Sequence, residues 1–128
     1  MKRPVDTDQA PRPIGPYSQA VRAGNLVFCA GQIGLEPATG QLVAGGVTVE
    51  ARQALDNLAA VLKAAGLSLA DVVKTTVYLV DLAEGAAFGA VYARAFTAPY
   101  PARATVQVVA LPAGARVEVD AIAVDPRV

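Results

Sequence analysis

Polar and apolar positions alternate at the start of residues 103–110, and this period of two predicts a β-strand. Its polar positions, Arg103, Thr105 and Gln107, are expected to share one face of the strand. Pro101 marks where the strand begins, because a proline can open a strand but does not fit its middle. An arginine at such a strand mouth offers a planar fork of donors that suits a carboxylate.

Apolar residues recur at helical spacing over residues 48–65 and again over residues 82–97, which predicts two helices. Thr48 is expected to cap the first helix with its hydroxyl. Asp81 and Glu84 have the spacing of a capping box for the second helix. Each predicted helix carries an apolar stripe that must pack against another surface.

Further segments rich in β-branched or apolar residues, bounded by turn residues, predict the other strands. The complete set of predicted strands is residues 17–22, 25–30, 72–80, 103–110 and 116–124. The order ββαβαββ indicates an α+β fold with one mixed sheet and both helices on one face. Residues 1–15 contain three prolines and predict an extended lead-in to a single domain of residues 1–128. Val and Ala line both sides of several strands, so a second subunit is expected to cover the other face of the sheet.

Charge and hydropathy narrow the possible partners. The 11 basic and 11 acidic residues cancel, which argues against a protein that binds nucleic acid or a membrane surface. The chain is 54% hydrophobic, yet no apolar run approaches the roughly 18 residues of a membrane span. The surplus apolar surface suits a subunit interface. One cysteine and the absence of a signal-peptide pattern predict a cytoplasmic protein.

The chain contains no histidine and a single cysteine, so zinc lacks its usual ligands and no metal site is expected. Cys29 sits in an apolar strand without a base to activate it, and we interpret it as a core residue. Glu118 and Asp120 share one face of the last strand, where paired carboxylates can do acid–base work or simply face solvent. For Arg103 the residues leave two interpretations equally open, ligand binding and a structural ion pair with Asp120, Glu118 or another carboxylate.

Five motifs occur along the chain in a fixed order. They are Ile14-Gly-Pro-Tyr-Ser-Gln-Ala20, Phe28-Cys-Ala-Gly-Gln-Ile33, Val72-Val-Lys-Thr-Thr-Val-Tyr-Leu79 with Asp81, Pro101-Ala-Arg103 and Val117-Glu118. Together they resemble the RidA family, also called the YjgF/YER057c/UK114 family, over about residues 13–124. The order and spacing of the five motifs are specific to the family, and less specific to one activity within it.

The resemblance implies a homotrimer of chorismate-mutase-like subunits with three clefts between them. It also implies hydrolysis of reactive 2-imino acids, or their enamine tautomers, to 2-oxo acids and ammonia without a cofactor. The site residues carried over from the family are Arg103, which grips the substrate carboxylate; Glu118, which positions water; Tyr17 and Gly31, which line the cleft; and Thr105, which contributes backbone groups. Two positions depart from the family pattern: Ala30 stands where active members commonly have serine, and Gly89 where many have asparagine.

Two alternatives to a 2-imino acid deaminase stay open at this point. A non-catalytic trimeric module that holds small carboxylate metabolites needs Arg103 but not Glu118, and the departures at Ala30 and Gly89 favour it. RNA cleavage, which some relatives carry out, is disfavoured by the neutral charge and the lack of a basic aromatic surface.

The spacing of Arg103 and Glu118 sets a geometric condition on the site. If the last two strands form a simple hairpin around residues 111–115, Glu118 pairs near position 108, roughly 16 Å along the ladder from Arg103. One small ligand cannot meet both side chains across that gap. Either the strands are not paired in this way, or the cleft combines two chains. We favour the second, with Arg103 and Tyr17 from different subunits and the chain that supplies Glu118 left open.

Overall fold

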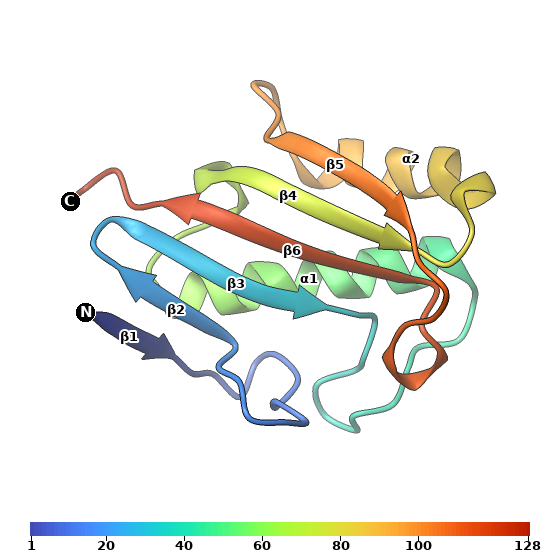
Figure 1. Cartoon of the computed structure of the whole chain (residues 1–128), viewed down its shortest axis with the longest axis horizontal. Helices are drawn as coiled ribbons and strands as arrows, with labels where there is room; N and C mark the ends of the chain where they lie inside the picture. The colour runs from blue at the N-terminus through green and yellow to red at the C-terminus, as the bar shows by residue number, and fades with distance from the viewer.

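A computed structural model describes residues 1–128 as one sheet with two helices packed against one of its faces (Figure 1). The strands are β1 (Lys2–Val5), β2 (Ala20–Ala23), β3 (Leu26–Gln32), β4 (Val72–Leu79), β5 (Ala102–Gln107) and β6 (Val117–Val124). The helices are α1 (Val47–Ala64) and α2 (Gly85–Ala95), with short 3₁₀ turns η1 (Leu69–Asp71), η2 (Leu82–Glu84) and η3 (Pro112–Gly114). The predicted α+β class and ββαβαββ order are confirmed, with β1 added at one edge from within the lead-in.

The order of strands across the sheet is β1-β2-β3-β6-β4-β5. The pair β4–β5 is parallel and every other pair is antiparallel, so the sheet is mixed, as predicted. The simple hairpin considered for the last two strands is not formed, because β4 lies between β5 and β6; the alternative that these strands are not directly paired, which we did not favour, holds. The reason is the crossover through α2, which returns the chain parallel to β4 and places β5 on the outer edge. The last strand then fills the central position between β3 and β4.

The core lies between the sheet and the two helices, which are drawn behind the sheet in Figure 1. Alternate residues of β6 point into it, and all of the following are buried: Val117, Val119, Ala121 and Ala123. The helix α1 meets them with an apolar stripe centred on Leu58 and Leu62, both fully enclosed. The opposite sheet face carries partly exposed apolar side chains such as Phe28 and Val106. None of the helices is both long and apolar enough to cross a bilayer.

Both helix starts differ in detail from the sequence prediction. Helix α1 begins at Val47, after Gly46, and no side chain caps it, so Thr48 is not the cap. The φ of Gly46 is 83°, a left-handed conformation that glycine adopts without strain. At the second helix, the Asp81 carboxylate caps the 3₁₀ turn η2 by accepting from the backbone N–H of Ala83. The partner expected for a capping box, Glu84, instead forms an ion pair with Arg116, so the box is not formed.

Candidate functional site

Arg103 lies on the outer strand β5, on the face of the sheet that also carries the helices. It is in register with Thr75, whose buried hydroxyl is hydrogen-bonded to the hydroxyl of Tyr92 on α2. The Arg103 guanidinium carbon lies 4.6 Å from the centre of the Tyr92 ring. Stacking on an aromatic face orients a guanidinium while leaving its N–H edge free. Arg103 takes part in no ion pair, so the ion-pair interpretation of this residue does not hold within one chain.

A cavity of about 540 Å³ opens beside this guanidinium, and we call it the Arg103 cavity. Its lining residues are Gly89, Tyr92, Ala93, Tyr100, Pro101 and Arg103. They come from α2, from the segment that leads into β5, and from β5 itself. The cavity contains one positive group and no carboxylate, so it can receive an anion and offers nothing to activate water.

Glu118 lies on the central strand β6, on the face of the sheet away from the helices. It is in register with Tyr78 on β4 and is half-buried. Burial raises the pKa of the Glu118 carboxyl, and the nearby Asp120 charge raises it further. No cation offsets these effects. The Asp120 carboxylate is fixed in position by two hydrogen bonds, which it accepts from the Tyr78 hydroxyl at 2.9 Å and from the Thr76 backbone N–H at 3.2 Å.

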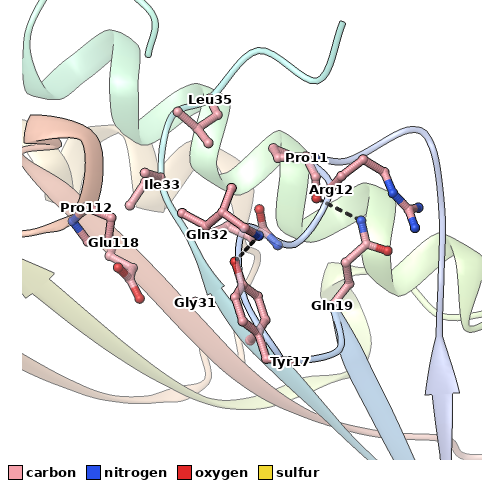
Figure 2. Close-up of a pocket in the computed structure, with 12 residues that line it drawn as sticks. Pro11, Arg12, Tyr17, Gln19, Gly31, Gln32, Ile33, Leu35, Pro112 and Glu118 are labelled. Atoms are coloured by element: carbon pink, nitrogen blue, oxygen red, sulfur yellow. Dashed lines mark hydrogen bonds between the residues drawn. The ribbon is translucent and has the colours of Figure 1, made fainter. Parts of the chain in front are cut away.

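A second cavity of about 350 Å³ lies at the end of β3 and includes Glu118; we call it the Glu118 cavity (Figure 2). Tyr17 and Gly31 line it as well, and the Tyr17 hydroxyl accepts a hydrogen bond from the Ile14 backbone at 3.3 Å. Gly31 makes room for the carboxylate: a Cβ at this position would lie 2.8 Å from Glu118 Cδ and closer still to its oxygen. A glycine is therefore required wherever Glu118 takes this position.

Three buried polar side chains hold the loops around the Glu118 cavity. The Gln19 amide accepts from the Thr7 backbone N–H at 2.8 Å and donates to the Pro11 carbonyl at 2.9 Å. The Asn57 amide on α1 donates to the carbonyls of Ile33 and Leu35, at 3.1 and 2.9 Å. The Glu50 carboxylate, also on α1, accepts from the Arg116 backbone N–H at 2.8 Å. The cavity walls are thus anchored to the helical core.

The structure brings together some of the predicted site residues and separates others. Tyr17, Gly31 and Glu118 meet at one cavity, whereas Arg103 lines the other. Thr105 is on the same face as Arg103, in register with Val77, and lines neither cavity. The prediction that Arg103 and Thr105 lie on the same face of the strand is confirmed. Their functional roles stay predictions.

Gln32 is a site residue that the sequence reasoning missed. It lines the Glu118 cavity and is only 6% exposed, and it is in register with Val119, whose side chain is buried in the core beneath the helices. The available signal was a polar residue at the end of an apolar strand, directly after Gly31.

Cys29 is buried in the core, where burial first and the Asp120 charge second raise its pKa to about 12. It is a thiol at neutral pH and a poor nucleophile.

Comparisons with known proteins find relatives over nearly the whole chain. The family model described as Endoribonuclease L-PSP matches residues 7–125. A goat (Capra hircus) protein named 2-iminobutanoate/2-iminopropanoate deaminase is 51% identical, over 97% of this chain and 90% of its own length. A Thermotoga maritima crystal structure superimposes with a TM-score of 0.94 at 48% identity, covering 97% of this chain and 98% of the other. RidA from an Antarctic Psychrobacter superimposes with a TM-score of 0.93 at 45% identity, covering 95% and 98%. The chain belongs to the Endoribonuclease L-PSP family, the RidA family that its motifs resemble.

Proposed function

We propose that this protein hydrolyses small 2-imino acids, and their enamine tautomers, to 2-oxo acids and ammonia. The observation that carries the proposal is the pair of half-sites: an unpaired guanidinium stacked on Tyr92, and a half-buried Glu118 carboxyl whose pKa is raised. These are the two groups that the reaction needs, one for the substrate carboxylate and one for water. The name of the goat relative, at about half identity over nearly the whole chain, supports the same chemistry.

We further propose that each active site is built from two chains of a homotrimer. The Arg103 cavity and the Glu118 cavity lie on opposite faces of one sheet, so a single small ligand cannot reach both within a chain. Packing the open sheet face of one subunit against its neighbour would cover Phe28 and Val106 and could bring the two cavities together. We assign Arg103 to one subunit, and Tyr17, Gly31 and Glu118 to the next.

The proposed reaction uses the residues as follows. The Arg103 fork binds the carboxylate of the protonated imine, and stacking on Tyr92 keeps that fork oriented. Glu118 orients a water molecule and takes its proton as the oxygen adds to the imine carbon. The proton then passes to the nitrogen of the carbinolamine, the carbinolamine hydroxyl gives its own proton to Glu118 as the C=O bond forms and the C–N bond breaks, and a 2-oxo acid and ammonia leave. A carboxyl with a raised pKa suits both the uptake and the return of this proton.

Loss of imine in the presence of the protein tests this function. An L-amino-acid oxidase acting on alanine and on 2-aminobutanoate would generate 2-iminopropanoate and 2-iminobutanoate in situ. We expect faster disappearance of both imines with the parent protein, and the uncatalysed rate with Arg103→Ala at matched concentration. No acceleration by the parent protein would refute the deaminase.

The same assay separates the deaminase from a carboxylate-binding module. Ala30 lines the Glu118 cavity and supplies no hydroxyl to the substrate, which is the observation that favours a module. A module would bind 2-oxobutanoate in a calorimeter and lose that binding in Arg103→Ala, but would leave the rate of imine loss unchanged.

A further inference from the structure

Gly89 lies in the middle of α2, where the fold gives no reason for a glycine. Its φ is not left-handed, so other residues could adopt the same backbone conformation. A Cβ added at this position would meet nothing within 4 Å, so no neighbour requires the missing side chain. Glycine also destabilises a helix interior relative to alanine, because it loses more backbone freedom on folding. The stability of the chain therefore does not account for a glycine at position 89.

The absent side chain enlarges the Arg103 cavity, which Gly89 lines together with Ala93. These two residues are four apart on α2, so they lie one turn from each other on the same face of the helix. Both are small, and they leave the cavity open along the helix. Its volume of about 540 Å³ lies in the range of pockets that hold drug-sized molecules. The imine derived from alanine, whose side chain is a single methyl group, would fill only a small part of it.

Tyr100 forms another wall of the same cavity and is 55% exposed in the chain. It stands between Pro99 and Pro101, and a proline restricts both its own backbone and that of the residue before it. An aromatic ring on so restricted a backbone presents a large apolar surface to a ligand, and burying that surface favours binding.

The charges around the cavity define the kind of molecule that fits it. Arg103 is the only charged residue in the lining, and its fork suits one carboxylate. The rest of the lining consists of two tyrosines, a proline, an alanine and a glycine, so the side chain of the ligand should be apolar. A second charge on that side chain would lose its water without gaining a partner.

We propose that the Arg103 cavity selects 2-imino acids with large apolar side chains, and that Gly89 and Tyr100 set this preference. This inference rests on the proposed function and names the substrate class within it. The carboxylate binds the Arg103 fork, the side chain lies between α2 and the Tyr100 ring, and the imine carbon faces the Glu118 cavity of the neighbouring subunit. A side chain at position 89 would take the space that the substrate needs.

The test compares four imines, which an L-amino-acid oxidase generates in situ from alanine, 2-aminobutanoate, leucine and phenylalanine. We expect the parent protein to have a kcat/KM at least about tenfold higher on the leucine and phenylalanine imines than on the alanine imine, because added apolar groups in such a pocket strengthen transition-state binding. The readout is the ratio of kcat/KM on the phenylalanine imine to kcat/KM on the alanine imine. Loss of folded or assembled protein lowers both values equally and leaves this ratio unchanged.

Three variants test the two residues. Gly89→Leu fills the cavity and should lower the ratio at least about tenfold. Gly85→Leu is the matched control, because a Cβ at Gly85 also meets nothing within 4 Å and Gly85 does not line the cavity. It should keep the parental ratio. Neither of these variants should melt below the parent, since leucine favours a helix over glycine. Tyr100→Ala removes the aromatic wall and should also lower the ratio, while kcat/KM on the alanine imine stays parental.

The outcomes separate this inference from the proposed function. A parent protein that acts on all four imines with equal kcat/KM, or best on the alanine imine, would keep the deaminase and overturn the apolar preference. A parental ratio in Gly89→Leu, or an equal fall of the ratio in Gly85→Leu, would overturn the role of Gly89. If the parent accelerates the loss of no imine, the proposed function fails, and calorimetric titration with 4-methyl-2-oxopentanoate and with pyruvate tests the cavity by itself. Tighter binding of the first would support the apolar preference, and equal affinities would overturn it.

Discussion

Arg103 and Glu118 lie on opposite faces of the sheet, separated by the strand β4. Arg103 is in register with Thr75, whose side chain is buried beneath α2, whereas Glu118 is in register with Tyr78 on the open face. Residues an odd number apart along a strand point to opposite faces, and Thr75 and Tyr78 are three apart. The two groups on which the proposed reaction depends therefore cannot face the same ligand within one chain.

This relationship predicts complementation between inactive variants. Arg103→Ala and Glu118→Gln should each be inactive alone. In oligomers mixed at random from equal amounts of both, a site that draws one residue from each of two chains has both intact in about a quarter of cases, which follows from the symmetry of a closed ring. Activity near that fraction should return in verified mixed oligomers. A site contained in one chain would show no recovery, because every chain carries one of the two defects.

The guanidinium of Arg103 should not be replaceable by an ammonium. Arg103→Lys keeps the charge but loses both the bidentate fork and the stacking on Tyr92. We expect kcat/KM to fall at least about tenfold, the loss of one hydrogen bond between charged groups. Arg94→Lys on the exposed side of α2 is the matched control and should keep parental kinetics. Parental kinetics in a folded Arg103→Lys variant would contradict the anchor role.

The pH–rate profile should report the environment of Glu118. Because the carboxylate form orients water, kcat/KM should rise with pH through the pKa of Glu118, and burial with the Asp120 charge raises that pKa above its ordinary value. Asp120→Asn removes the charge and should move the acid limb toward lower pH. Asp56→Asn, an exposed carboxylate on α1, should leave the limb in place. An acid limb at the same pH in parent and Asp120→Asn would rule out Glu118 as the titrating group.

Two glycines near the cavity should respond differently to an added methyl group. At Gly31 the new Cβ meets the end of the Glu118 side chain, which can move, so Gly31→Ala should lose activity with little change in melting temperature. At Gly34 the new Cβ meets the backbone of α1 at Glu50, 2.8 Å from its Cα. Gly34→Ala should therefore lower the melting temperature, because packed backbone does not yield. Equal melting temperatures for these two variants would contradict the contacts.

Cys29 should be dispensable for chemistry. Its pKa of about 12 keeps it protonated, and its core position shields it from reagents. Cys29→Ala should keep most of the parental activity while losing about 1 kcal/mol of stability from the small void. Iodoacetamide should label the parent at pH 8 only after denaturation. An inactive but folded Cys29→Ala oligomer would revive a covalent mechanism.

Local patterns in the sequence were sufficient to predict most of the helices and strands. The alternation along 103–110 placed Arg103 and Thr105 on one face, and the register of β5 with β4 confirms it. The helical spacing located α1 and α2 to within a few residues, apart from their first turns. The order of the motifs identified the family. Each of these depends on residues close together in the chain, and a period of 2.0 or 3.6 is a local property.

The pairing of strands was decided by the tertiary structure. Nothing in the segment 116–124 specifies β3 and β4 as its neighbours; that choice comes from burying the apolar face of β6 beneath the helices and from the crossover through α2, which involve the whole chain. The opposite facing of Arg103 and Glu118 follows from that pairing. A register between strands depends on contacts between segments that are far apart in the chain, and a local pattern does not contain that information.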